Sequence, residues 1–157
     1  MPKSPTTKVR QLTESRPPDI MLRLGPDFTI EWVSDGCERL GLCGLFRVGE
    51  TFSGAMHKED AKRATERFAN LFKGQVPSPA DICFDNDHGD ALWMRWVETP
   101  IFGDQGKITG VQALGWDITA IRSQRDADAE ALGRYTRMMQ HLPVGAILIE
   151  NERLRVN

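Results

Sequence analysis

The sequence of 157 residues has no surplus of basic residues, no long apolar run and no apolar segment at its N-terminus. Its 20 Lys and Arg are offset by 22 Asp and Glu, so the net charge is −2 and binding to nucleic-acid phosphates is not expected. No stretch approaches the roughly 20 apolar residues that cross a bilayer. Residues 1–16 also lack the apolar core of a secretory signal. These absences predict a cytoplasmic protein, with no nucleic-acid partner and no membrane contact in this stretch of chain.

Cysteine is scarce, and the recognisable catalytic motifs are missing. The three cysteines, Cys37, Cys43 and Cys83, are odd in number, and the first two are six positions apart, which fits no CxxC zinc or redox motif. We therefore expect reduced, buried thiols and no metal site. The sequence also contains no P-loop, no HExxH motif and no Ser-His-Asp order. Catalysis by this stretch of chain is not expected.

Five short segments are rich in strand-forming residues and are separated by turn residues. They cover residues 20–24, 28–33, 81–84, 91–102 and 107–118. The turn Gly25-Pro26-Asp27 lies between the first two segments and predicts a hairpin. Short, turn-rich connectors join the last three segments, which should therefore be antiparallel neighbours.

A helical region separates these two groups of strands. It opens at His57, and Ala64, Phe68 and Leu71 then recur at spacings of four and three residues, which places them on one apolar stripe. Gly74 follows as a terminator. The order of two strands, a helical middle and three strands predicts an α+β domain, in which helices cover one face of a single antiparallel sheet.

A long, polar helix pattern follows over residues 120–142, and Thr119 before it is a good N-cap. Leu132, Tyr135 and Met139 belong to a seam with heptad spacing that also contains charged residues. The seam predicts a homodimer, formed through a coiled coil of this helix or through the N-terminal lead-in. The alternative is an ordinary surface helix that packs on its own domain.

The last segment, residues 143–157, repeats the layout of residues 18–33. Each has a Pro, a short apolar strand, a polar turn and the beginning of a second strand. We therefore expect a structural repeat whose second copy is cut off, and a longer parent protein.

Taken together, motifs between Pro18 and Thr119 resemble those of a PAS domain, the five-stranded antiparallel sensory fold of bacterial signalling proteins. The matching motifs are Val33-Ser34 at the end of the hairpin, His57-x-Glu59-Asp60, Trp93-x-x-Trp96-x-x-x-Pro100, Gly106-x-Ile108-x-Gly110 and Asp117-Ile118-Thr119. The resemblance implies an N-terminal lead-in over residues 1–16 and a PAS domain over 17–119. A signalling helix would follow over 120–142, and the start of a second PAS domain over 143–157.

In PAS domains a ligand pocket lies between the main helix and the inner face of the sheet. Because side chains alternate along a strand, we place Leu92, Met94 and Trp96 on the inner face, together with Gln112 and Leu114. The resulting candidate pocket residues are Phe52, Phe68, Phe72, Ile82, Phe84, Met94, Trp96, Gln112 and Leu114. Gln112 would be the polar contact for a ligand. It could instead bond to protein groups or water, and the aromatic set could be plain core.

The resemblance also bears on cofactors. PAS proteins that form a flavin photoadduct use a reactive Cys whose position is matched by Phe52, and flavin-holding Asn positions are matched by Phe84 and Met94. That photochemistry is not expected. Non-covalent flavin remains open, as does haem, although residues 61–73 contain no His to ligate it. The leading expectation is no cofactor.

The resemblance implies a sensory or regulatory domain of a multidomain bacterial signal-transduction protein, either a histidine kinase or a cyclic-di-GMP enzyme. It would sense a small ligand and relay the signal to its C-terminal helix through Asp117, Ile118 and Thr119. Its partners would be a second copy of the chain and the downstream PAS and output domains. The alternative is a ligand-free PAS module for dimerisation and relay.

Overall fold

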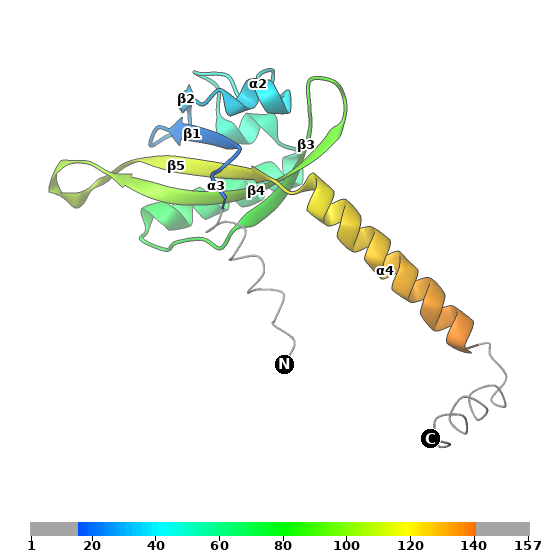
Figure 1. Ribbon diagram of the computed structural model, residues 1–157. Coiled ribbons are helices and arrows are strands. Elements are labelled where there is room, and N and C mark those ends of the chain that lie inside the picture. Colours follow the sequence, from blue (N-terminus) through cyan, green and yellow to red (C-terminus); the bar gives the residue numbers. More distant parts are fainter. Residues whose placement is uncertain (1–15, 141–157) are drawn as a thin grey trace. The chain divides into compact units, whose positions relative to one another are not determined.

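The computed structural model describes residues 16–140, which divide into two units between Thr119 and Ala120 (Figure 1). Residues 1–15 of the predicted lead-in over 1–16 lie outside the described residues, and so does the predicted second copy over 143–157. The elements are β1 (Ile20–Leu24), β2 (Ile30–Val33), α2 (Gly36–Leu40), η1 (Phe52–Ala55), α3 (Lys58–Phe72), β3 (Ala80–Asp85), β4 (Ala91–Phe102), η2 (Asp104–Gly106), β5 (Ile108–Asp117) and α4 (Thr119–Gln140).

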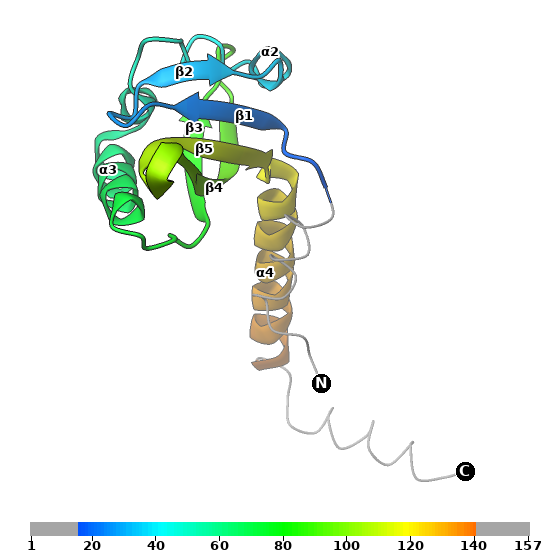
Figure 2. The same cartoon turned by 90° about the vertical axis from the view of Figure 1, so that its left-hand side faces the viewer.

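The first unit contains one five-stranded sheet with the strand order β2-β1-β5-β4-β3, and every neighbouring pair is antiparallel. The predicted hairpin forms β1 and β2, and the predicted three-strand group forms β3, β4 and β5. The two groups are joined because β1 pairs with β5, from Ile20 opposite Gly115 to Leu24 opposite Val111. The first and last strands of the unit therefore lie side by side at the centre of the sheet (Figures 1 and 2).

The helices of this unit cover one face of the sheet, as predicted (Figure 2). The α3 stripe of Ala64, Phe68 and Leu71 is buried, and the helix ends before Gly74, whose φ of +84° a glycine adopts without strain. On the opposite side of the core, the inward-facing residues of β1 are fully buried. The α+β architecture is confirmed.

The side-chain faces of β5 are the reverse of those we predicted. Gln112 is exposed and Leu114 is half-buried on the outer face, whereas Val111 and Ala113 are fully buried on the inner face. The reason is the pairing with β1, since directly opposite residues share a face and β1 turns its own apolar residues inward. The assignments on β3 and β4 hold, because Ile82, Phe84, Met94 and Trp96 are all buried in the core.

The expectation that all three cysteines are thiols was wrong for Cys37 and Cys43, which form a disulfide. Helix α2 ends at Gly41 in a left-handed conformation (φ +66°), and the chain turns back so that the N–H of Leu42 donates to the carbonyl of Cys37 at 2.8 Å. This turn brings the two Cα atoms to 5.1 Å, within the usual range for a disulfide. Cys83 lies outside the disulfide.

The second unit contains α4, the helix predicted after Thr119. Three residues of the predicted seam are largely exposed on it: Leu132 at 66%, Tyr135 at 61% and Met139 at 40%. The seam therefore presents apolar surface, and the homodimer stays a prediction. None of the helices within residues 16–140 combines the length and apolar character needed to cross a bilayer.

Candidate functional site

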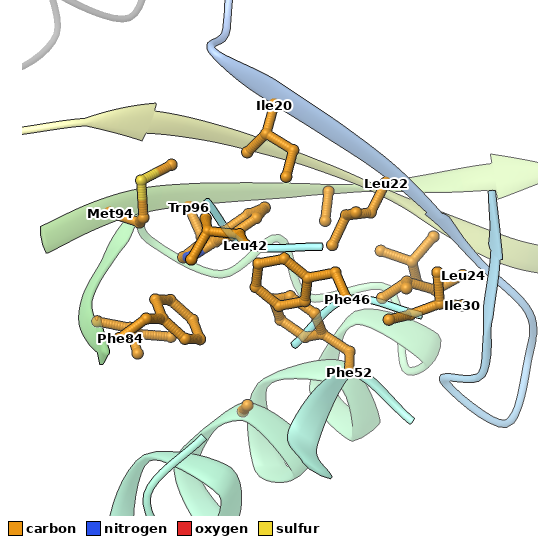
Figure 3. Close-up of a cluster of buried hydrophobic side chains, with 14 of the residues drawn as sticks. Ile20, Leu22, Leu24, Ile30, Leu42, Phe46, Phe52, Phe84, Met94 and Trp96 are labelled. Atoms are coloured by element: carbon orange, nitrogen blue, oxygen red, sulfur yellow. The ribbon is translucent and has the colours of Figure 1, made fainter. Parts of the chain in front are cut away.

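The interior of the first unit is dominated by a cluster of aromatic rings from several elements. Figure 3 shows Phe46, Phe52 and Phe84 gathered around Trp96 of β4. Their ring centroids lie 5.7, 5.1 and 6.2 Å from that of Trp96, and each ring stands at 77–80° to the indole. Edge-to-face pairs of this kind add about 0.5–1.5 kcal/mol each beyond simple burial. The indole of Trp96 is therefore the centre of the cluster.

A second set of rings extends the cluster toward α3. Phe28 stacks on Phe68 at 4.8 Å and meets the edge of Phe72 at 5.8 Å, and Phe68 reaches Phe52 at 5.7 Å. Phe28 holds a φ of +66°, which is uncommon for a bulky residue and places its ring over α3. The rings thus form one connected series from the first hairpin to β3.

Most of the predicted pocket residues come together in this cluster. Phe52, Phe68, Ile82, Phe84, Met94 and Trp96 are buried in one core, and Phe72 packs at its edge. Gln112 and Leu114 lie on the other face of the sheet, so Gln112 cannot be the polar contact inside. Sequence reasoning missed Phe46, because it lies in an irregular segment with no periodicity to indicate its direction. It also missed Phe28, although alternation with Ile30 in the predicted segment 28–33 could have placed that ring inward.

Among residues 16–140, the indole nitrogen of Trp96 has no hydrogen-bond partner, although the side chain is fully buried. A buried donor without an acceptor costs about 1–3 kcal/mol, and most buried polar groups in folded proteins are paired. The rings that contact the indole are those of Phe46, Phe52 and Phe84, which offer no acceptor lone pair. Trp96 therefore presents an unused donor to the interior.

A buried ion pair lies on the same face of β4, two residues further along. Glu98 is only 2% exposed and faces Arg67 of α3, whose Nη2 is 2.5 Å from its Oε2. Nη1 of Arg67 donates to the carbonyl of Ser78 at 2.6 Å, while its buried Nε has no partner in the part of the chain that the structure describes. Burial raises the pKa of Glu98, and the neighbouring guanidinium opposes this increase only in part. We did not single out Glu98 from the sequence, although the alternation that places Met94 and Trp96 inward extends to it and could have predicted this site.

The residues expected to relay a signal form a hydrogen-bonded junction. The N–H of Ile118 donates to the carbonyl of Trp93 at 2.8 Å, and the N–H of Trp93 donates to Oγ1 of Thr119 at 2.9 Å. The carboxylate of Asp117 accepts from the N–H of Thr119 at 2.9 Å. The hydroxyl of Thr119 thus binds β4, and the local contact expected of an N-cap is supplied by Asp117 instead. The first residue of α4 is fixed to β4.

The junction also includes the start of the described chain. The N–H of Asp117 donates to Oδ2 of Asp19 at 2.8 Å, and Nε1 of Trp116 donates to the carbonyl of Arg16 at 3.0 Å. The guanidinium of Arg16 in turn pairs with Asp19. The segment that enters β1 and the segment that leaves β5 are therefore bonded to each other.

The outer face of the sheet carries a shallow groove of about 600 Å³. Leu22, Arg23, Glu31, Trp32, Ile101 and Gln112 line it. Nε of Arg23 lies 3.3 Å from Oε2 of Glu31, and Trp32 is 49% exposed. Gln112 belongs to this groove rather than to the aromatic interior.

The described residues offer little to a metal or to haem iron. Within 16–140, no three His, Cys, Asp or Glu side chains lie close enough together to hold a metal ion. Nε2 of His57 lies 3.9 Å from Oδ2 of Asp85, and both side chains are largely exposed. His88 is exposed in the turn between β3 and β4, where its N–H donates to Oδ1 of Asn86. Neither histidine faces the aromatic cluster.

Comparison with known proteins identifies the fold. No protein-family model matches the sequence, and no curated protein matches it. Among solved structures, the PAS domain of a protein from Colwellia psychrerythraea gives a TM-score of 0.56 at 16% identity, covering 73% of this chain and 97% of that one. The N-terminal domain of a diguanylate cyclase with a PAS/PAC sensor from Marinobacter aquaeolei gives 0.54 at 20% identity, covering 66% and 97%.

A third similar structure is the sensor region of a sensor histidine kinase. It gives a TM-score of 0.50 at 18% identity and covers 74% of this chain and 49% of that one. At these identities the likeness shows the fold. The sheet order and the helices on one face agree with it, and the chain has the PAS fold.

Proposed function

We propose that this PAS-fold chain is a sensory and regulatory domain of a multidomain bacterial signalling protein, and that it is not itself catalytic. It would bind a small ligand among the aromatic rings and pass a conformational change to α4 through Asp117, Ile118 and Thr119. The observation that carries the proposal is the double role of β4. Met94 and Trp96 of this strand face the interior, while the backbone of Trp93 is bonded to Ile118 and Thr119.

Strand β4 gives a direct mechanical route from the interior to α4. A ligand that displaces the indole of Trp96 shifts the backbone of its strand, because core rings are closely packed and cannot yield independently. A shift of Trp93 then lengthens its bonds to Ile118 and Thr119. A ligand changes the balance between two arrangements only by the difference between its affinities for them. The site must therefore bind more tightly when the junction is in one of its two states.

The similar structures support a place in signal transduction. One belongs to a diguanylate cyclase with a PAS/PAC sensor, and another is the sensor region of a sensor histidine kinase. By analogy, we propose that the output of this protein is a histidine kinase or a cyclic-di-GMP enzyme that acts in the cytoplasm. A downstream PAS domain, beginning within residues 143–157, would connect α4 to that output.

We further propose that the protein acts as a homodimer through α4. The exposed apolar side chains of Leu132, Tyr135 and Met139 support this assignment, since surface of this kind is normally covered by a partner. A dimer would also make the relay more sensitive to ligand binding, because a change at the junction of one copy would alter the packing of both paired helices.

The second candidate function is a ligand-free module for dimerisation and relay. The observation in its favour is the continuity of ring contacts from Phe28 to Phe84, because the interior is already occupied by its own side chains. In this alternative, the domain passes on changes that arise elsewhere in the protein, and Trp96 is only core.

Absorption spectroscopy of the purified, untreated protein separates the two functions. A flavin or Soret band would indicate a cofactor, and mass spectrometry after denaturation identifies a colourless ligand. A stoichiometric small molecule in the extract supports the sensory function. A clean spectrum and an empty extract, together with no change in stability across a panel of small metabolites, would favour the ligand-free module.

A further inference from the structure

The chemical class of the ligand follows from the unpaired donors in the interior. We propose that the ligand is a small, uncharged molecule that presents a hydrogen-bond acceptor, such as an aryl ketone, to Nε1 of Trp96. This inference rests on the proposed sensory function and assigns the polar contact that Gln112, on the opposite face of the sheet, does not supply.

The direction of the hydrogen bond is set by the side chains involved. In the described part of the chain, the two buried side-chain polar atoms without a partner are Nε1 of Trp96 and Nε of Arg67. Both atoms are donors only, because neither an indole nor a guanidinium nitrogen accepts. Glu98 follows Trp96 by two residues, so its pair with Arg67 lies about 7 Å along the same face of β4. The ligand must therefore bring acceptors rather than donors.

Water is a poor substitute for this ligand beside Trp96. A buried water molecule needs two to four polar partners, whereas the rings around the indole belong to Phe46, Phe52 and Phe84. An apolar molecule with a single acceptor satisfies the donor and keeps dispersion contact with the rings. The surroundings therefore favour an aromatic or aliphatic body that carries a carbonyl or an aza nitrogen.

The charge of the ligand is limited by the same environment. An ion that enters an apolar interior loses its hydration, and nothing restores it unless an opposite charge is at hand. The charged pair on this face, Arg67 with Glu98, is already matched within itself at 2.5 Å. A carboxylate or phosphate ligand would have to displace Glu98 from Arg67. An uncharged ligand enters without that exchange.

The test uses acetophenone and ethylbenzene, which share a shape but differ in the carbonyl acceptor. The full chain is labelled with ¹⁵N, and its four indole N–H signals, one for each Trp, are followed during titration. Trp96→Phe identifies the signal of Trp96. We expect this signal to move downfield with acetophenone and not with ethylbenzene. We also expect acetophenone to bind roughly tenfold more tightly, the ratio that corresponds to one net hydrogen bond.

Two variants distinguish the hydrogen bond donated by the Trp96 indole from the apolar contact made by its ring. In Trp96→Phe we expect the advantage of acetophenone over ethylbenzene to disappear, while both compounds still bind. Trp32→Phe, on the exposed outer face, is the matched control and should keep the tenfold ratio. If Trp96→Phe does not fold, the ratio of the two affinities on the wild-type chain, which needs no assigned signal, decides the question alone.

The possible failures are distinguishable. Equal binding of the two compounds with an unmoved Trp96 signal would overturn the acceptor class and leave the sensory function standing. A molecule released by denaturation that lacks a hydrogen-bond acceptor would also overturn the acceptor class and leave the sensory function standing. If neither compound binds and the extract is empty, both the acceptor class and the ligand-sensing function are wrong.

Discussion

Trp93 of β4 is hydrogen-bonded to Thr119 of α4: the backbone N–H of Trp93 donates to the hydroxyl oxygen of Thr119 at 2.9 Å. The same tryptophan accepts the N–H of Ile118 at its carbonyl. One residue of β4 thus fixes both Ile118, which follows β5, and Thr119, the first residue of α4. Leu92 and Met94, the residues on either side of Trp93, both pack in or against the buried core, so β4 connects the buried cluster with the junction.

Removing the hydroxyl at position 119 should loosen this junction. Thr119→Val keeps the shape of the side chain but leaves the N–H of Trp93 without its acceptor, and we expect a loss of about 1 kcal/mol in the free energy of unfolding. Hydrogen exchange at the Trp93 amide should accelerate. Thr119→Ser, which keeps the hydroxyl, is the control. Unchanged exchange in Thr119→Val would show that the bond does not hold the junction.

A methyl group at position 115 should be poorly tolerated. A Cβ on Gly115 would lie 2.9 Å from Cζ3 of Trp96 and 2.7 Å from Cγ2 of Ile20, so the indole or the strand must move. We expect Gly115→Ala to lower the free energy of unfolding by about 1–3 kcal/mol, as overpacked cores do. Denaturant unfolding followed by tryptophan fluorescence measures the loss.

The matched control for this substitution is Gly133→Ala on α4. A Cβ there meets nothing within 4 Å, and alanine has the higher helix propensity. This variant should leave the unfolding of the sheet unchanged. Equal stability of both variants would contradict the close approach of Gly115 and Trp96.

The buried carboxyl of Glu98 should make stability depend on pH. Its pKa is raised in the folded protein, chiefly by burial, so the folded state holds the proton more tightly than the unfolded chain. The stability that this group contributes is therefore greatest below the ordinary pKa of a glutamate. It is lost as the pH rises through the raised folded value. Glu98→Gln removes this titration.

The free energy of unfolding, measured from pH 4 to pH 8 for both proteins, checks this prediction. The wild-type curve minus the Glu98→Gln curve should fall as the pH rises. A rising difference would mean that Arg67 lowers the pKa of Glu98 more than burial raises it. A flat difference would mean that the carboxyl titrates equally in both states.

The disulfide between Cys37 and Cys43 predicts a definite thiol count. Alkylation of the unfolded, unreduced chain should add one group, at Cys83, and alkylation after reduction should add three. Because the disulfide closes a short loop, reduction should cost about 2 kcal/mol of stability. Cys83→Ser should then show no alkylation before reduction. Three alkyl groups on the unreduced protein would contradict the disulfide between Cys37 and Cys43.

Charges placed in the exposed seam of α4 should dissociate the proposed dimer. Leu132→Asp combined with Met139→Asp puts two like charges opposite their copies in a coiled coil, where apolar contact is needed. Light scattering should then report a monomer. Ala127→Asp, outside the seam, is the control and should remain dimeric. A double variant that remains dimeric would exclude this helix face from the interface.

Much of the fold could be predicted because its signals are local. The period of α3 placed Ala64, Phe68 and Leu71 on one buried stripe, and turn residues marked the hairpin and the three later strands. The candidate site could be predicted only where one inward-facing residue of a strand was known, because the alternation of side chains then gives the direction of the others. On β4 it placed Met94 and Trp96 correctly, and it also implied the inward direction of Glu98.

The other features depended on contacts between residues far apart in the sequence. Which face of β5 turns inward was decided by its pairing with β1 and by the close approach of Gly115 to Trp96. The position of Phe46 and the pairing of Cys37 with Cys43 depended on turns and irregular segments with no periodic signal. The sequence by itself thus determined the elements and their order, because helix and strand periods are set by neighbouring residues. Only the tertiary structure decided what faces the interior, because the direction of each side chain depends on the partner strand or helix that packs against it.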